Sequence, residues 1–316
     1  SCKMKMTEEN VAQMQCAKQF SDHQHRVNSI DYSPDGIHMI SSSDDESIVL
    51  YNCQTGTKTR TLNSKKYGVD LIHFSHTVTD AVHCSTKLDD TIRYLSLHDN
   101  KYIRYFSGHT KKVVTLSMSP IDDTFLSASL DKTIRLWDLR SQNCQGIMQL
   151  PHKAIAAFDP EGLIFAAGVN SESVKLYDVR SYDKGPFTTF NLDQEKHCEW
   201  TSMKFAPNGK TILLNTNGEY IRIVDAFGGA ITQTLVGHKN AKRIPMEASY
   251  SPDSNFVFCG SSDQKIYAWS VESGRQVAAL QTTHTPFLQQ VAFNPRYYMM
   301  ATACNNVHFW IPLEEE

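Results

Sequence analysis

One short phrase recurs seven times along the chain: an alternating apolar run, an aromatic residue or methionine, and then a small residue before proline. The third residue of this phrase stands at positions 34, 76, 120, 160, 207, 252 and 295, and His76 replaces the proline in the second copy. The intervals are therefore 42, 44, 40, 47, 45 and 43 residues. Such a period is typical of the four-stranded blades of a β-propeller. The repeat predicts an all-β propeller of seven blades over about residues 21–313.

Each copy has the same internal order of strands and turns. In the first copy, residues 27–32 alternate with a period of two, and a Pro-Asp-Gly turn leads to the small and apolar residues 39–43. An Asp- or Asn-bearing turn then leads to a third run that ends on an aromatic residue, Tyr51 in the first copy and Trp137 in the third. The fourth run varies between copies, as we expect of an outer edge strand.

The two ends of the chain are expected to close the ring. The last copy ends at residues 310–312 and supplies only three strands. Thr7 followed by Glu8 and Glu9 predicts the start of a short helix, and residues 16–20 read as a strand. We expect residues 1–20 to form this helix and the outer strand of the last blade, which makes residues 1–316 one β-propeller domain.

The third copy contains a set of polar residues that resembles the signature of WD repeats. In that family a histidine, a serine, an aspartate and a tryptophan form one hydrogen-bonded chain inside the blade, because a buried Asp must have its acceptor capacity filled. The matching residues are His109, Ser127, Asp131 and Trp137. Partial versions are expected at the entries to blades one, four, six and seven, with His25, His152, His238 and His284. A Ser-His-Asp triad would use the same residue types, but recurrence along the repeats favours a structural role.

The sequence predicts no catalytic residues, no cofactor and no metal. It has no glycine-rich phosphate loop, no carboxylates paired at helical spacing and no His-Glu-x-x-His motif. The eight cysteines are at least 14 residues apart, so no Cys-x-x-Cys zinc knuckle exists. The formal net charge of −3 gives no overall field that would attract nucleic acid or an anionic membrane. These features favour a binding protein.

Basic residues concentrate in the first three repeats. Residues 58–67 contain four basic residues and no acid, and three more follow one blade further on. A charge run is usually only a solvated face. The sharper hypothesis is a patch that binds a phosphorylated or acidic peptide with sub-millimolar to micromolar affinity, at about 1 kcal/mol per contact. The candidate residues are Lys58, Arg60, Lys65, Lys66, Arg104, Lys111 and Lys112.

Three longer runs, residues 64–70, 90–106 and 159–171, resemble the WD repeat-containing protein 82 family. This family includes the WD-repeat subunit of the COMPASS histone methyltransferase. The resemblance implies a nuclear, non-catalytic scaffold, monomeric within a hetero-complex. Such a subunit holds a histone lysine methyltransferase and connects it to the serine-phosphorylated C-terminal repeats of RNA polymerase II. It also joins a protein phosphatase 1 complex in transcription termination, and it implies neither sequence-specific nucleic-acid binding nor a membrane.

A second resemblance points to a different function. Residues 137–140 read Trp-Asp-Leu-Arg and residues 177–180 read Tyr-Asp-Val-Arg, 40 residues apart at matching positions of two blades. Both resemble the WDxR box of propellers that recruit substrates to cullin-RING ubiquitin ligases. Under this alternative, Arg140 and Arg180 would contact the ligase adaptor, although short motifs also match by chance.

Overall fold

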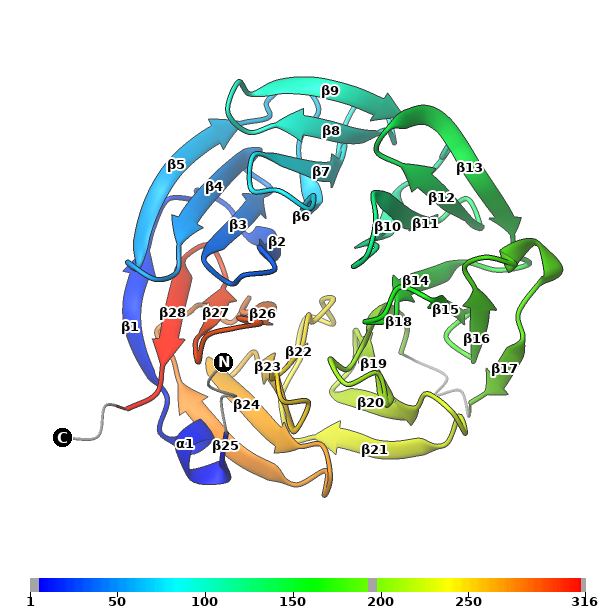
Figure 1. Ribbon diagram of the computed structural model, residues 1–316. Coiled ribbons are helices and arrows are strands. Elements are labelled where there is room, and N and C mark those ends of the chain that lie inside the picture. Colours follow the sequence, from blue (N-terminus) through cyan, green and yellow to red (C-terminus); the bar gives the residue numbers. More distant parts are fainter. Residues whose placement is uncertain (1–5, 193–197, 314–316) are drawn as a thin grey trace.

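The computed structural model describes residues 6–192 and 198–313, and these residues form seven four-stranded antiparallel sheets. Figure 1 shows the sheets arranged as blades around a common centre. Each blade runs from its innermost strand outward in chain order, except that the outermost strand of blade 7 comes from the N-terminal end of the chain. The predicted seven-bladed propeller is confirmed.

The strands are grouped below by their place in the blade, in the order of blades 1 to 7. The innermost strands are β2 (Val27–Tyr32), β6 (Asp70–Phe74), β10 (Val113–Met118), β14 (Ala154–Phe158), β18 (Trp200–Phe205), β22 (Ser249–Tyr250) and β26 (Gln290–Phe293). The second strands are β3 (His38–Ser43), β7 (Asp80–Cys84), β11 (Thr124–Ser129), β15 (Ile164–Val169), β19 (Thr211–Thr216), β23 (Phe256–Gly260) and β27 (Met300–Ala303).

The remaining strands follow the same order. The third strands are β4 (Ser47–Asn52), β8 (Ile92–Ser96), β12 (Thr133–Asp138), β16 (Ser173–Asp178), β20 (Tyr220–Asp225), β24 (Lys265–Ser270) and β28 (Val307–Ile311). The outermost strands are β5 (Thr57–Asn63), β9 (Lys101–Phe106), β13 (Ser141–Gln149), β17 (Thr188–Asn191), β21 (Ile231–Val236), β25 (Gln276–Gln281) and β1 (Gln15–Phe20). The helical elements are α1 (Glu8–Ala12) and the 3-10 turn η1 (Tyr182–Lys184).

The antiparallel order of each blade creates two faces. One face carries the loops from each outermost strand to the next blade, together with the turns between second and third strands; we call it the entry rim. The opposite face carries the turns between first and second strands and between third and outermost strands; we call it the exit rim.

The hydrophobic core of the described residues is divided into seven clusters, and each lies between two adjacent blades. The cluster between blades 2 and 3, for example, packs Phe106 against Phe125 and Trp137. A single blade therefore has no core of its own, because each of its two faces is buried only by a neighbour.

Hydrogen bonds near the channel reinforce this packing. Side chains on an innermost strand accept hydrogen bonds from backbone N–H groups on the innermost strand of the next blade, which the repeat pattern did not predict. The acceptor and donor pairs are Ser29 with Ile72 at 2.9 Å, Asp31 with Phe74 at 2.9 Å, Thr115 with Ala156 at 3.2 Å, Ser117 with Phe158 at 3.1 Å, and Ser249 with Phe293 at 3.0 Å.

The ring closes through the N-terminal segment, as predicted. Strand β1 pairs antiparallel with β28, from Gln15 opposite Ile311 to Phe20 opposite Val307. Helix α1 begins after Thr7, whose hydroxyl accepts a hydrogen bond from the Asn10 N–H at 3.1 Å. The helix carries Val11 into the cluster between blades 6 and 7, next to Met6 and Met14.

Deleting residues 1–20 should destabilise the protein far more than loss of an ordinary tail. The deletion removes the edge strand of blade 7 and the buried Val11 and Met14 side chains, each of which contributes about 1.5–3 kcal/mol. We expect a lower and broader thermal unfolding transition, measured by circular dichroism. The exposed substitution Glu9→Ala should leave the transition unchanged, and an equally stable deletion variant would contradict closure by β1.

Candidate functional site

The polar set predicted in blade 3 forms one buried chain of hydrogen bonds. His109 Nδ1 lies 2.8 Å from Asp131 Oδ2, and His109 Nε2 lies 2.6 Å from Ser127 Oγ. Trp137 Nε1 donates to the same Ser127 Oγ at 2.9 Å. Because indole can only donate and carboxylate only accepts, Ser127 donates to His109 Nε2, and His109 carries its proton on Nδ1.

This set of hydrogen-bonded residues in blade 3 is unsuited to catalysis because a substrate has no access to its serine. Ser127 has no exposed surface, and its oxygen is already shared by His109 and Trp137. Burial lowers the pKa of His109 despite the nearby Asp131, which keeps the imidazole neutral. The chain therefore fixes the blade and offers no nucleophile to a substrate.

Blade 1 contains a related chain, built on a different histidine from the one expected. His23 lies 2.8 Å from Ser41 Oγ through Nε2 and 2.7 Å from Ser47 Oγ through Nδ1. His25 is exposed and takes no part, so its assignment is wrong. The two histidines are two positions apart in the loop between β1 and β2, and only the His23 side chain is buried in the blade.

The later blades keep this arrangement to different degrees. In blade 7, His284 Nε2 lies 2.7 Å from Thr302 Oγ1, which also accepts a hydrogen bond from Trp310 Nε1 at 2.9 Å. In blade 6, His238 is buried against the ring of Trp269 at 5.3 Å. In blade 4, His152 is exposed, so its expected role is wrong.

Blade 2 uses an arginine in place of the histidine chain. The guanidinium of Arg93 stacks on the ring of Tyr67 at 3.3 Å and also faces Tyr102 and Tyr105 at about 5 Å. Its Nη2 donates to Asp89 at 2.6 Å and its Nε to Ser85 at 2.9 Å, so its buried charge is neutralised. The sequence analysis did not predict this site, because its only local signal was Asp89 four residues before Arg93, and the three tyrosines are 9 to 26 residues away along the chain.

Three of the predicted phosphopeptide-binding residues lie on outermost strands, and their side chains already form hydrogen bonds or an ion pair with other residues of the protein. Arg60 Nη1 donates to the carbonyls of Leu97 and His98 in blade 2, at 2.7 and 2.9 Å. Arg104 Nη1 makes the equivalent bond to the Leu139 carbonyl in blade 3. These two arginines clamp adjacent blades together. Lys58 pairs with Asp22 at 2.9 Å.

The other four predicted residues lie together on entry-rim loops. Lys65 and Lys66 lie between β5 and β6, and Lys111 and Lys112 lie between β9 and β10. All four side chains are exposed. The Lys65 amine donates to the carbonyl of Asp45 at 2.9 Å, and the Lys66 amine lies 5.2 Å from the centre of the Tyr67 ring.

An acidic residue lies next to these lysines at the mouth of the channel. Lys112, Arg26 and Asp70 line a cavity of about 240 Å³ on the entry rim. Burial raises the pKa of Asp70 to about 6, although Lys112 and Arg26 act in the opposite direction. Lys153, Glu199 and Glu247 line the same cavity, so an anion bound here would meet three basic and three acidic side chains.

The two WDxR boxes lie on the exit rim, opposite the lysines. The side chain of Arg140 is 74% exposed, and its Nε and Nη2 bond both oxygens of Asp138 at 3.0 and 2.7 Å. The hydrogen bond from Arg140 is the main reason that the pKa of Asp138 is lowered. Arg180 is exposed as well, and its N–H donates to Asp178 at 2.8 Å.

Pairs of polar side chains from different blades line the channel. It is a cavity of about 600 Å³, in which His73 lies 3.6 Å from Asp31 and Lys204 lies 2.9 Å from Glu247. Among residues 6–192 and 198–313, no three His, Cys, Asp or Glu side chains are grouped to hold a metal ion. The helices in this part of the chain are too short or too polar to cross a membrane.

The seven blades, together with the buried chains of histidine, hydroxyl and tryptophan in blades 3 and 7, define a WD-repeat propeller. The family model described as "WD domain, G-beta repeat" matches residues 14–52, 100–138 and 229–270. The chain is 59% identical to WD repeat-containing protein 82 of Drosophila melanogaster over 99% of both chains. It therefore belongs to the WD repeat-containing protein 82 family, as the sequence predicted.

Two further relatives carry the names of complexes. The chain is 33% identical to "Set1 complex component swd2" of Schizosaccharomyces pombe, over 90% of this chain and 92% of the relative. It is 32% identical to "COMPASS component SWD2" of Saccharomyces cerevisiae, over 90% of both chains.

The substitution Ser127→Ala should cost about 2–6 kcal/mol of unfolding free energy. It leaves His109 Nε2 and Trp137 Nε1 buried without a partner, at about 1–3 kcal/mol each. Urea denaturation at neutral pH measures the loss, and the exposed Ser107→Ala is the matched control. A midpoint equal to that of the control would show that the chain contributes nothing to stability.

Stability should fall in two stages as the pH decreases. Burial lowers the pKa of His284 to about 3 and of His308 to about 4, so the unfolded state binds protons first below about pH 6.5. Burial would raise the pKa of Asp131, but hydrogen bonds from Thr133 and His109 outweigh it and lower that pKa to about 2. Its contribution is present above pH 4 and is lost between about pH 4 and 2.

Urea midpoints between pH 7 and pH 2.5 test this pH dependence. Asp131→Asn should lower stability at pH 7 and flatten the decline below pH 4, because the variant has no carboxylate to protonate. A variant that declines below pH 4 as steeply as the unmodified protein would rule out this role of Asp131.

Proposed function

We propose that this protein is a non-catalytic scaffold subunit of a histone lysine methyltransferase complex. The observation that carries the proposal is its similarity over nearly the full length to relatives named as components of the Set1 complex and of COMPASS. The closed ring supports it, because a rigid propeller presents two rims and an outer wall to different partners. The serine of the best-formed His-Ser-Asp set is buried, which agrees with a non-catalytic role.

The scaffold connects this complex to the serine-phosphorylated C-terminal repeats of RNA polymerase II in the nucleus, and it also joins a protein phosphatase 1 complex. Support for the phosphopeptide contact comes from the entry-rim lysines, Lys65, Lys66, Lys111 and Lys112, which are exposed on two neighbouring loops. Lysine ammonium groups act on phosphate as point charges without fixed bidentate geometry. Contacts of this kind suit weak binding that is strengthened by several repeats in one tail.

The residues of the proposed site are reduced from seven to these four. Arg60 and Arg104 already donate to carbonyls of the next blade, and Lys58 pairs with Asp22. Lys65 is kept because its bond goes to a carbonyl of a neighbouring entry-rim turn, that of Asp45, and does not join two blades from the outer strands. Charge reversal of the two arginines would break blade contacts as well as remove positive charge. Any loss of binding in those variants could therefore reflect structural damage.

The double variants Lys65→Glu/Lys66→Glu and Lys111→Glu/Lys112→Glu test the site. Each should weaken binding of a serine-phosphorylated two-repeat polymerase peptide about tenfold or more, because two partly exposed contacts are worth about 1 kcal/mol each. Fluorescence anisotropy measures the dissociation constant, which should rise further with salt. The unphosphorylated peptide should bind weakly to every variant.

Lys239→Glu/Lys242→Glu is the matched control, since these exposed lysines lie on the entry-rim loop of blade 6. Affinity equal to that of the unmodified protein in both test variants would remove the phosphopeptide proposal. Partners purified with the tagged protein from nuclear extract separate the alternatives. Methyltransferase subunits or phosphatase 1 would support the scaffold, and a cullin adaptor lost on Arg140→Ala and Arg180→Ala would favour the ligase.

A further inference from the structure

We propose a second docking surface on the exit rim of blades 2 to 4, which binds a segment of a partner protein with apolar residues flanked by lysine or arginine. The surface is centred on Val78, Ile121 and Leu163, which we call the apolar arc. It lies on the face opposite the entry-rim lysines and does not depend on the phosphopeptide proposal.

The apolar arc is built from three successive turns that contact one another. Val78, Ile121 and Leu163 lie in the turns between the first and second strands of blades 2, 3 and 4, and they are 38%, 61% and 48% exposed. A Cβ atom on Gly162 would lie 2.8 Å from Ile121 Cγ1, so Ile121 packs directly against the turn that carries Leu163. The His76 ring bonds the Asp122 carbonyl, which joins the turn of blade 2 to that of blade 3.

The equivalent turns in the other four blades have a different character. Of their described residues, none exposes a large aliphatic side chain. Blades 5, 6 and 1 present polar residues such as Asn208, Asp253 and Asp35. Blade 7 exposes Tyr297, whose hydroxyl accepts a hydrogen bond from Gln54 at 2.7 Å. Scattered exposed hydrophobic residues need no explanation, but three on adjoining turns form a patch.

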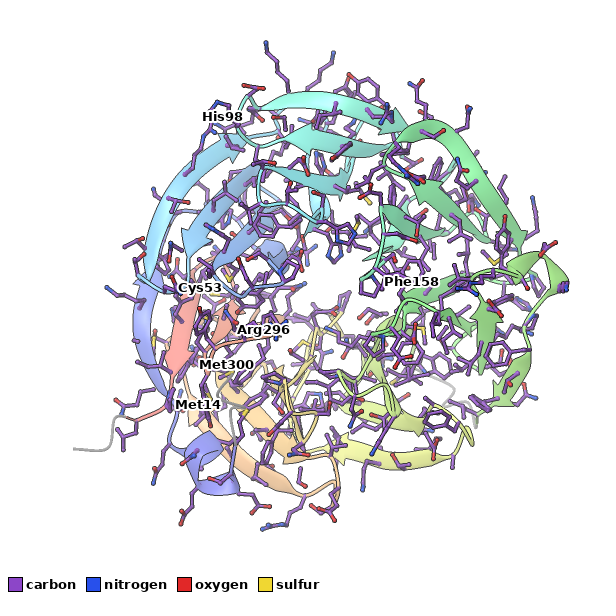
Figure 2. The ribbon with its side chains drawn as sticks, in the orientation of Figure 1. Met14, Cys53, His98, Phe158, Arg296 and Met300 are labelled. Atoms are coloured by element: carbon purple, nitrogen blue, oxygen red, sulfur yellow. The ribbon has the colours of Figure 1, made fainter. Side chains whose placement is uncertain are left out.

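The patch continues toward the mouth of the channel. Pro120, directly before Ile121, and Pro160, three residues before Leu163, line the channel cavity together with Phe158. Figure 2 shows Phe158 at the edge of the central opening. A bound segment could therefore contact the exposed arc and place one apolar side chain against this rim of proline and phenylalanine.

The charge around the arc identifies the partner. The exit-rim turns of blades 2 to 4 contain six acidic and three basic residues, and the strand ends beside them add Asp80, Asp138, Asp178 and Lys101. Together they carry an excess of five negative charges, whereas the whole chain has a net charge of −3. Arg140 is already bound by Asp138. Glu161 is exposed two residues from Leu163. Such a field attracts a basic segment and repels an acidic one, which gives specificity as well as faster association.

Occupation of both rims follows from the geometry of the blades. The lysine loops and the apolar arc lie at opposite ends of the same strands in blades 2 and 3, so a ligand on one rim does not cover the other. The ring would then hold a negatively charged ligand and a basic partner segment at the same time.

A pair of synthetic peptides tests the chemistry of the arc. One 16-residue peptide alternates blocks of leucine and lysine, and its counterpart replaces every lysine by glutamate. The lysine peptide should bind the full chain in a fluorescence anisotropy titration, and the glutamate peptide should not. Ile121→Ser/Leu163→Ser should weaken binding about tenfold, and Glu161→Lys should weaken it severalfold with a smaller salt dependence.

Two matched variants control for general effects. Phe227→Ser removes an apolar side chain that is 80% exposed on the exit rim of blade 5, and Glu172→Lys reverses a charge on the entry rim of blade 4. Both should bind the lysine peptide as the unmodified protein does. Equal binding of the two peptides, or equal affinity of the Ile121→Ser/Leu163→Ser variant and the unmodified protein, would overturn the proposal.

Crosslinking in the assembled complex identifies the natural segment. A benzophenone amino acid is placed at position 163, or at position 227 as the control, in the tagged protein, and crosslinked peptides are sequenced by mass spectrometry after purification from nuclear extract. Position 163 should crosslink to a segment whose apolar residues are flanked by lysine or arginine. A crosslink to an acidic segment or to a cullin adaptor, or no crosslink above that from position 227, would contradict the proposal.

Discussion

Closure of the ring is the constraint on which the rest of this structure depends. Each apolar cluster in the described chain lies between two blades, so a blade at an open end would expose half of its buried surface. The pairing of β1 with β28 removes both open ends at once. Helix α1 adds Val11 to the apolar cluster between blades 6 and 7. Hydrogen bonds near the channel and the arginine clamps at the outer wall then join blades that closure has already brought together.

The closed ring explains why polar residues can be buried without chemical function. In blade 3 the chain from Trp137 to Asp131 satisfies each donor and acceptor in turn, and a fully satisfied network rigidifies its surroundings. Blade 2 reaches the same result with Arg93, which stacks on Tyr67 and pairs with Asp89. The repeat therefore tolerates very different side chains inside a blade, including His238 in blade 6, whose ring packs against Trp269 and makes no hydrogen bond to the described residues.

Function in such a molecule lies on its rims, where the repeat leaves the residues free to vary. The entry-rim lysines and the apolar arc occupy the same sector of the ring but opposite faces, and they differ in charge and polarity. Arg60 and Arg104 show why a charge run alone is a weak guide. Their sequence context resembles that of the exposed lysines, yet their side chains are bonded to the neighbouring blade.

The sequence by itself determined the number of blades, the closing strand and the residues of the best-preserved hydrogen-bonded chain, because each follows from a periodic pattern of local residues. Only the tertiary structure decided that His23 and not His25 enters blade 1, because both lie in one loop and their difference is burial. It also decided which basic residues bond the next blade and that the turns carrying Val78, Ile121 and Leu163 adjoin, since these turns are more than 40 positions apart and meet only when neighbouring blades pack.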